Sequence, residues 1–318
     1  MAQIIVTHGV PVKGLEYLEG HTVHYPGLFN VFDREAMLRL LPEAEAVIAC
    51  GALSGEMIQA APKLKLIANY GAGYDSVDVK TATQRHIPVT NTPNETREPT
   101  AEVAIGLILA VTRRICELNQ RLRQEPTSAV FGMGRHMGMG LQGNTLGIVG
   151  MGHIGGIVAE FGRLMGMKVI YHNRRPAEKD HGAQYVALEE LLATSQIVSL
   201  HCPLNDSTRN LLNAKRLSLM PERSILINTA RGPVVDYAFL AKQLREGKLW
   251  GAGLDVFHQE PQIPQELLAL PNVVLTPHIG TNTQEARYEM TRACCQRILE
   301  ALKGQRPSHV VNPEIYEG

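Results

Sequence analysis

A glycine-rich stretch is the first feature of this sequence that could bind a reactive molecule. Apolar residues lead into Gly150, a run with helical spacing follows, and a second apolar stretch comes at 168–172. In this strand–loop–helix–strand context a G-x-G-x-x-G pattern allows a tight turn and a close approach of backbone to a pyrophosphate. The positive end of the helix would then face the phosphates of a dinucleotide. The residues expected to contact the phosphates through their backbone are Gly150, Gly152, His153, Ile154 and Gly155.

The residues after the second strand bear on which nicotinamide cofactor would bind. In an NAD site an acidic residue about 20 positions beyond the glycines accepts hydrogen bonds from the ribose 2′-hydroxyl. Here the stretch 168–172 ends in Asn173, Arg174 and Arg175. Two guanidinium groups can pair with a 2′-phosphate, which a carboxylate would repel. The sequence therefore predicts a preference for NADP(H), with NAD(H) as the alternative; a solvated basic turn is the other interpretation of the two arginines.

Polar side chains follow three apolar stretches further along the chain. Arg231 comes after the first, Asp255 and Glu260 after the second, and His278 after the third. In an open parallel sheet, ligands bind outside the carboxyl ends of the strands, so these groups would lie near a bound molecule. No cluster of His, Cys and Asp has the spacing of metal ligands, and we predict no metal.

Length and composition set the broad class of the protein. A chain of 318 residues is long for one core and favours two domains. Lysine plus arginine equals aspartate plus glutamate, 31 of each, so nothing favours a nucleic acid or an anionic membrane. The five cysteines show no C-x-x-C spacing, which fits a reducing cytoplasm. We see no signal peptide, and no apolar run approaches the roughly 18 residues that span a membrane.

The elements that must position these residues can be read from the apolar pattern. In the first hundred residues strands and helices alternate, with Val12 to Leu18 a candidate helix and Asp33 and Ser54 as expected helix caps. The Pro-rich segment 91–99 is predicted to be a linker. The nearly all-apolar segment 101–115 is predicted to be a central helix, buried between domains or subunits. Segment 128–143 is expected to be a long loop. The predicted strands of the first part lie at 4–6, 21–25, 46–50, 64–70 and 87–91.

Beyond the glycine loop the same alternation continues. Strands are predicted at 168–172, 197–201, 224–228, 251–255 and 272–276, and helices at about 188–195, 209–219, 236–246 and 283–303. Together with the strand that leads into Gly150, this pattern indicates a doubly wound parallel sheet of six strands. Asp236 is expected to cap its helix.

The chain resembles the D-isomer-specific 2-hydroxyacid dehydrogenases, a family that includes glyoxylate/hydroxypyruvate reductases, phosphoglycerate dehydrogenases and 2-ketogluconate reductases. The fold class implied is α/β, with two doubly wound parallel-sheet domains. A Rossmann coenzyme domain (98–287) would be inserted in a flavodoxin-like substrate domain (1–97 plus 288–318). The motifs that carry the resemblance occur in family order: 71–75, 91–93, 101–102, the glycine loop, 228–232, 255–261 and 276–280.

The resemblance implies a catalytic set of three residues. Arg231 would bind the substrate carboxylate and polarise the 2-oxo group. His278 would be the proton donor in reduction and the base in oxidation, with Glu260 hydrogen-bonded to it. These roles suit hydride transfer, because hydride arriving at a ketone carbon leaves charge on oxygen, so a cation and a proton must be close. A neighbouring carboxylate favours the imidazolium form and keeps an acid available near neutral pH.

Further contacts are implied by the same resemblance. The substrate carboxylate would meet the backbone N–H groups of Ala72 and Gly73, with Leu53 nearby. Asp255 would meet the nicotinamide carboxamide. The remaining residues expected to line the cofactor site are His201, Pro203, Thr208, Thr229, Ala230 and Gly280.

The function expected from the sequence is NADP(H)-preferring reduction of a small 2-oxo acid to the D-2-hydroxy acid. Glyoxylate, hydroxypyruvate, 2-ketogluconate and a bulkier 2-oxo acid all stay open as substrates. The alternatives are an NAD(H)-dependent D-2-hydroxyacid or phosphoglycerate dehydrogenase, and a non-enzymatic, NAD(H)-sensing corepressor. A cytoplasmic homodimer is expected, because the apolar helix and the loop after it suggest a covered surface.

Overall fold

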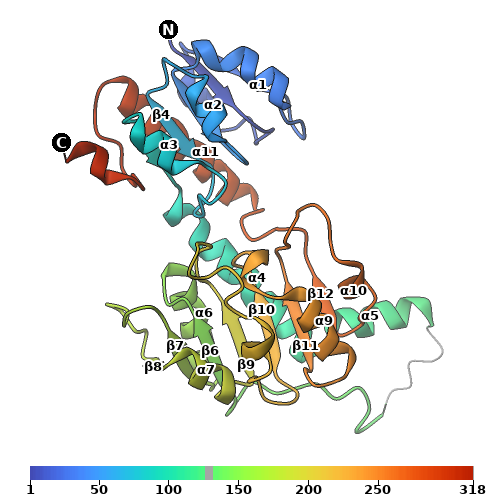
Figure 1. Ribbon diagram of the computed structural model, residues 1–318. Coiled ribbons are helices and arrows are strands. Elements are labelled where there is room, and N and C mark those ends of the chain that lie inside the picture. The colour runs from blue at the N-terminus through green and yellow to red at the C-terminus, as the bar shows by residue number, and fades with distance from the viewer. Residues whose placement is uncertain (126–131, 318) are drawn as a thin grey trace. The chain divides into compact units, whose positions relative to one another are not determined.

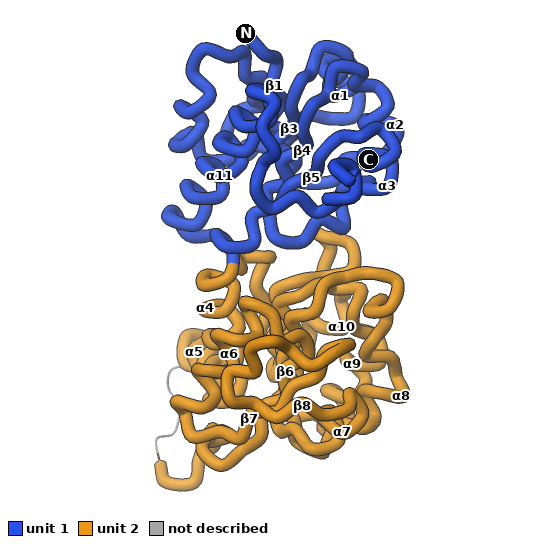
Figure 2. Tube along the Cα trace, turned by 90° about the vertical axis from the view of Figure 1, so that its left-hand side faces the viewer, with its two compact units in different colours: residues 1–96, 281–318 blue, residues 97–280 orange. Residues whose placement is uncertain are grey.

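The computed structural model describes residues 1–125 and 132–317, and the chain forms two compact units (Figure 2). Unit 1 comprises residues 1–96 and 281–318, and unit 2 comprises residues 97–280. Each unit contains one parallel sheet with helices on both faces. The predicted fold class, α/β with two doubly wound parallel sheets, is therefore confirmed.

Unit 1 has a five-stranded parallel sheet in the order β2-β1-β3-β4-β5, the flavodoxin-like order. Its strands are β1 (Gln3–Val6), β2 (Thr22–His24), β3 (Ala46–Ala49), β4 (Leu66–Asn69) and β5 (Val89–Thr90). Its helices are α1 (Arg34–Leu40), α2 (Gly55–Gln59), α3 (Val79–Gln84) and α11 (Gln284–Leu302), with short 3-10 turns at Leu15–Leu18, Leu41–Glu43 and Pro313–Tyr316.

Both faces of this sheet are apolar because successive side chains of a strand point to opposite sides. Ile5 packs in the core that α1, α2 and α3 cover, whereas Ile4 packs in the core that α11 covers. The predicted caps are confirmed: Asp33 and Ser54 accept hydrogen bonds from backbone N–H groups in the first turns of α1 and α2.

Unit 2 has a seven-stranded parallel sheet in the order β12-β11-β10-β9-β6-β7-β8 (Figure 1). Helices α4 and α6 cover one face, and α7, α8, α9 and α10 cover the other. The strands are β6 (Thr145–Val149), β7 (Lys168–His172), β8 (Gln184–Tyr185), β9 (Ile197–Leu200), β10 (Ile225–Asn228), β11 (Gly251–Leu254) and β12 (Val273–Leu275). The helices are α4 (Pro93–Thr112), which begins in unit 1, α5 (Ile115–Gln124), α6 (His153–Leu164), α7 (Leu188–Thr194), α8 (Ala214–Leu217), α9 (Tyr237–Arg245) and α10 (Gln265–Leu268), with a 3-10 turn at Gly232–Val234.

The predicted linker at 91–99 is wrong, because helix α4 already begins at Pro93 and continues through Pro99. Proline at the first helical position lacks only an N–H that would have no partner within the helix. Pro99 does remove one bond, but the helix continues where Ala101 and Ala104 are fully buried in the core of unit 2. Packing outweighs the local cost of the proline here.

Other differences concern the lengths and surroundings of elements. The central helix predicted at 101–115 is part of α4 and ends at Thr112, before the left-handed Arg114. Glu102 and Gly106 are exposed in the single chain, and burial of this helix between domains or subunits stays a prediction. The helix predicted at 209–219 is only α8, and the one at Val12 to Leu18 is a 3-10 turn after Gly14. The predicted loop 128–143 lies partly outside the described residues. The sheet has a seventh strand, β8, which the sequence did not reveal.

Candidate active site

The polar residues singled out in unit 2 follow three neighbouring strands. Arg231 lies beyond β10, Glu260 beyond β11 and His278 beyond β12, and these strands are adjacent at one end of the sheet. Because the strands are parallel, their carboxyl ends share one edge, which is where open α/β sheets bind ligands.

His278 and Glu260 form a hydrogen-bonded pair. His278 Nδ1 lies 2.7 Å from Glu260 Oε2, and the other carboxylate oxygen accepts a bond from the backbone N–H of Phe257 at 2.9 Å. Partial burial raises the pKa of Glu260, but the bonds from His278 and Phe257, with the charges of His278 and Arg231, outweigh burial and lower it overall. A carboxylate on Nδ1 leaves Nε2 of the same ring as the nitrogen that can exchange a proton with a ligand.

Asp255 organises the turn that carries His278. It is 1% exposed, and its carboxylate accepts bonds from the Thr276 hydroxyl (2.6 Å) and from the N–H groups of Ile279 (2.8 Å) and Gly280 (3.0 Å). His278 itself has a φ of 52°, in the left-handed region that non-glycine residues seldom adopt. Asp255, expected at the nicotinamide, thus has both oxygens bound within the 276–280 segment.

The turn that carries Arg231 is held by buried polar groups. Asn228 Nδ2 donates to the carbonyl of Arg231 and to the hydroxyl of Tyr237, each at 3.0 Å. A Cβ on Gly232 would lie 2.1 Å from the carbonyl carbon of Phe257, so only glycine lets this turn pack against the segment that leads to Glu260. Arg231 is half-buried. The predicted cap of α9 is confirmed, since Asp236 accepts from Phe239 N–H.

The glycine loop joins β6 to α6 at the same edge of the sheet. Gly150 has a φ of 103°, and a Cβ there would lie 2.6 Å from the carbonyl carbon of His201. A Cβ on Gly155 would meet the carbonyl oxygen of Gly150 at 2.2 Å, so the helix packs directly on the turn. Gly152, by contrast, faces open space, and no side chain caps α6. A helix amino terminus without a side-chain cap, as in α6, is suited to binding a pyrophosphate.

The residues after β7 divide into two kinds. Asn173 is used within the protein, because its Oδ1 accepts from Met151 N–H at 2.7 Å and so ties the strand end to the glycine loop. Arg174 and Arg175 are exposed. Strand β7 lies three strand spacings from β10, or about 14 Å, which suits an extended cofactor between Arg231 and the arginine pair.

The segment after β9 forms a compact turn beside the glycine loop. The Thr208 hydroxyl donates to the Pro203 carbonyl at 2.6 Å. His201 Nε2 is 2.9 Å from the Ser199 hydroxyl, and burial lowers the pKa of His201 to about 3. Thr229 and Ala230 are buried, with the Thr229 hydroxyl 3.4 Å from His201 Nδ1.

Comparison with known proteins assigns this arrangement to a family. The model of the "D-isomer specific 2-hydroxyacid dehydrogenase, NAD binding domain" matches residues 105–280. The chain belongs to this family. It is an NAD(P)-dependent oxidoreductase that acts on 2-hydroxy acids, as relatives along its whole length also indicate.

Three relatives illustrate how far the similarity extends. A glyoxylate reductase of Thermococcus litoralis is 40% identical, with 98% of this chain and 97% of the relative covered. The TT0316 protein of Thermus thermophilus is 39% identical, with a TM-score of 0.90 over 97% of this chain and 99% of that one. An NADPH-dependent glyoxylate/hydroxypyruvate reductase of Sinorhizobium meliloti, solved with NADP and malonate, is 31% identical, with a TM-score of 0.87 over 98% and 96%.

The residues of this dehydrogenase expected to bind substrate from unit 1 differ in exposure. Ala72 and Gly73 are half-buried in the loop after β4. Leu53 is fully buried in the core, its N–H donates to Ser76 O, and its carbonyl accepts from Asp78 N–H. Leu53 thus packs in the core of unit 1, and its expected place near the substrate stays a prediction.

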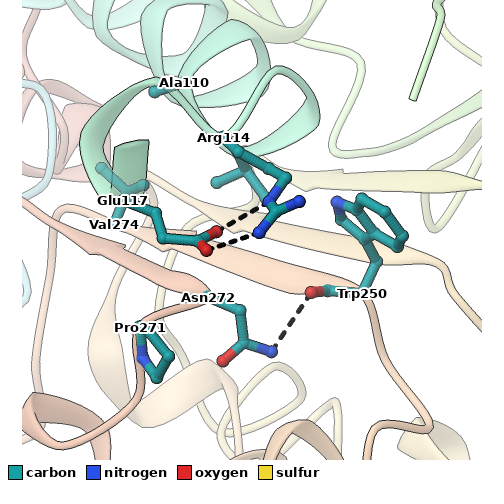
Figure 3. Close-up of a pocket in the computed structure, with 8 residues that line it drawn as sticks. Ala110, Arg114, Glu117, Trp250, Pro271, Asn272 and Val274 are labelled. Atoms are coloured by element: carbon teal, nitrogen blue, oxygen red, sulfur yellow. Dashed lines mark hydrogen bonds and ion pairs between the residues drawn. The ribbon is translucent and has the colours of Figure 1, made fainter. Parts of the chain in front are cut away.

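Unit 2 also contains a pocket, which Figure 3 shows in close-up. It has a volume of about 340 Å³, and its walls include Trp250 and Asn272, which precede β11 and β12. Arg114 and Glu117 line it as a bidentate ion pair with bonds of 2.8 and 2.6 Å. Since this is the amino-terminal end of the strands, the pocket is not part of the candidate active site.

Two polar residues of the dehydrogenase site were not anticipated as site residues. Asn228 is fully buried and also accepts from Ala230 N–H, and the hydroxyl of Tyr237 donates to the Val256 carbonyl at 2.6 Å. Burial raises the pKa of Tyr237, so it stays a neutral donor. An asparagine that ends an apolar strand is the one signal that could have revealed this.

In residues 1–125 and 132–317 no group of His, Cys, Asp and Glu could hold a metal, and no helix could span a membrane.

Proposed function

We propose that this dehydrogenase reduces a small 2-oxo acid to the D-2-hydroxy acid and prefers NADPH. The observation that carries the proposal is the His278–Glu260 pair, with its 2.7 Å bond and the charge of Arg231 close enough to lower the pKa of Glu260. It places an acid and a cation beside one another, as reduction of a carbonyl requires.

The residues divide the chemistry as follows. Arg231 pairs with the substrate carboxylate and polarises the 2-oxo group, because its planar fork matches two oxygens and it keeps its charge. Hydride, supplied by the reduced nicotinamide when it is bound, adds to C2, and the electron pair of the carbonyl moves to oxygen. His278 then gives the proton on Nε2 to that oxygen. Glu260 stabilises the imidazolium before the transfer and holds the ring in one orientation.

The catalytic assignment is tested by His278→Ala and Arg231→Ala in a reductase assay with glyoxylate and hydroxypyruvate. We expect a loss of at least about 100-fold in kcat/KM for each, because each removes a group that acts in the transition state. Turnover near that of the parent protein in either variant contradicts the assignment.

The preference for NADPH is proposed for two reasons. Arg174 and Arg175 are exposed and follow β7 at the position where an acidic residue would mark an NAD site. The S. meliloti relative is described as NADPH-dependent. The glycine loop would hold the pyrophosphate, with the segments at His201–Thr208 and Thr229–Ala230 beside it.

Kinetics with the two cofactors test this preference. We expect a higher kcat/KM with NADPH, and the double variant Arg174→Ala/Arg175→Ala should raise the KM for NADPH about tenfold or more while leaving that for NADH unchanged. Arg245→Ala is the control, because Arg245 is also exposed but lies at the end of α9. A higher kcat/KM with NADH refutes the preference.

The substrate is proposed to be glyoxylate, hydroxypyruvate or 2-ketogluconate, with the N–H groups of Ala72 and Gly73 binding its carboxylate. The glyoxylate reductases among the relatives support glyoxylate, and the glyoxylate/hydroxypyruvate reductase of S. meliloti supports hydroxypyruvate as well. A panel of 2-oxo acids assayed with NADPH and NADH ranks them. A chain that reduces none of them refutes the function.

A homodimer in the cytoplasm completes the proposal. On α5 two apolar side chains stay exposed, Ile115 at 54% and Leu122 at 44%, and a second copy would cover them. Light scattering tests the dimer, and a monomer at micromolar concentration contradicts it. The cytoplasm is proposed because all five cysteines are free thiols.

A further inference from the structure

The loop that follows β4 in unit 1 is held by its carbonyl groups. Three consecutive carbonyls, those of residues 71 to 73, each accept a hydrogen bond from the side-chain amide of an asparagine. The bonds run from Asn69 Nδ2 to Gly71 O (2.9 Å) and to Gly73 O (3.0 Å), and from Asn91 Nδ2 to Ala72 O (2.7 Å). The Gly71 carbonyl also accepts from the backbone N–H of Thr92 at 3.0 Å.

Fixing a carbonyl also fixes the N–H of the next residue. In a trans, planar peptide unit the C=O of one residue and the N–H of the next point in opposite directions. The three held carbonyls therefore turn the N–H groups of Ala72, Gly73 and Tyr74 away from the asparagines. Within the described chain none of these three N–H groups donates a hydrogen bond, and the three residues are half-buried or exposed. The loop thus presents three successive backbone donors to a ligand.

The two asparagines are themselves fixed by the sheet. Asn69 is the last residue of β4 and is 3% exposed, and both hydrogens of its amide are used on the loop. Asn91 follows β5, the neighbouring strand, and its N–H donates to the carbonyl of His309 at 3.3 Å. Each of the three carbonyls is therefore hydrogen-bonded to an asparagine at or just after the end of a strand.

We propose that Asn69 and Asn91 are positioning residues that orient the N–H groups of Ala72, Gly73 and Tyr74 to bind the substrate carboxylate. This inference rests on the proposed function, and it adds Tyr74 N–H as a third donor to the two expected. Only an amide suits both asparagine positions: aspartate has the same shape but, as a carboxylate, cannot donate to a carbonyl. Its charge would also repel the carboxylate of the substrate.

The experiment compares Asn91→Asp and Asn69→Asp with the parent protein, using glyoxylate as substrate and oxamate as an unreactive analogue. For each variant we expect the KM for glyoxylate to rise about 10- to 100-fold, as loss of a charge-assisted hydrogen bond predicts, with kcat changed much less. The inhibition constant of oxamate should rise in parallel. The dissociation constant of NADPH, measured by fluorescence, should stay within twofold, because the residues proposed to bind it lie in unit 2.

Asn272→Asp is the matched control. Asn272 is half-buried and its Nδ2 also donates to a backbone carbonyl, that of Trp250 at 3.1 Å, but it lines the pocket of Figure 3. This variant should keep the KM for glyoxylate. If the buried Asn69→Asp does not fold, as judged by its thermal transition, the half-buried Asn91→Asp decides alone.

The outcomes separate the two proposals. If the parent protein reduces 2-oxo acids but Asn91→Asp keeps the KM for glyoxylate within twofold, the positioning role is refuted and the function stands. A parallel loss of NADPH affinity also refutes it, because general damage then explains the result. If the parent protein reduces no 2-oxo acid, the proposed function fails and the inference falls with it.

Discussion

Replacing Glu260 with glutamine isolates what the carboxylate contributes to proton transfer. Glutamine keeps the size of the side chain but removes the negative charge, and its single carbonyl oxygen can replace only one of the two carboxylate oxygens as an acceptor. The present contact is 2.7 Å, and a second oxygen of Glu260 is held by Phe257 N–H. The variant therefore removes the counter-charge of the imidazolium together with one of the two hydrogen bonds that Glu260 accepts.

The structure gives the size of the effect. Two unit charges about 4 Å apart near a protein surface interact by about 4 kcal/mol. The side chains of His278 and Glu260 are 46% and 35% exposed, so solvent screens the pair, and we take about 1.5 to 2 kcal/mol for its charge-assisted bond. At about 1.4 kcal/mol for each factor of ten, Glu260→Gln should lower kcat/KM about 10- to 30-fold.

The assay is the steady-state reduction of glyoxylate with NADPH between pH 5 and 9. We expect kcat/KM to be lower in Glu260→Gln throughout this range, because the imidazolium has lost its counter-charge. Glu160→Gln is the control: Glu160 Oε1 lies 2.8 Å from His181 Nδ1, the same kind of pair, outside the candidate site. If Glu260→Gln stays within twofold of the parent protein throughout this range, the role of the pair is refuted.

Three further predictions concern the surroundings of this pair. Arg231→Lys should lower kcat/KM for 2-oxo acids by about 100-fold, because lysine lacks the planar fork, and steady-state kinetics would show a loss under fivefold if this is wrong. Gly232→Ala should destabilise the protein by about 2 kcal/mol or more in urea, since its Cβ would lie 2.1 Å from the carbonyl carbon of Phe257; an unchanged midpoint would contradict the packing. The pKa of His201 is lowered from 6.5 to about 3 in the folded protein. Below pH 6.5 the unfolded chain therefore binds a proton that the folded protein does not bind. The free energy of unfolding should then fall, as the pH is lowered, by up to about 1.4 kcal/mol per pH unit. His201→Gln should flatten that fall in urea titrations at pH 7, 6, 5 and 4, and an equal slope in both proteins would count against the buried neutral imidazole.

Apolar periodicity was sufficient to predict most of the fold. Buried parallel strands appear in the sequence as short continuous apolar runs, and β3, β4, β9 and β10 are fully buried along their length. Strand β8 was not predicted because both of its residues are exposed and their side chains end in polar groups, so the sequence shows no apolar pattern there. The start of α4 was missed because prolines were taken as breakers, whereas tertiary packing decides the conformation there.

The sequence could predict only those residues of the candidate site that directly follow a recognisable strand. Arg231, Glu260 and His278 each follow a recognisable strand, and the topology puts those strands next to one another. The bonds that orient them come from Asn228 and Tyr237, whose contacts depend on how separate turns pack and leave no periodic signal. The full burial of Leu53 could not be predicted from the sequence for the same reason.

The order of strands in unit 2 has a consequence for how such an enzyme can diversify. The arginine pair follows β7, on one side of the junction between β6 and β9, whereas the proton-transfer pair follows β11 and β12 on the other. With the roles proposed above, substitutions at Arg174 and Arg175 would change the coenzyme preference without touching the acid–base pair. Coenzyme preference and reaction type could then change independently of each other within one domain.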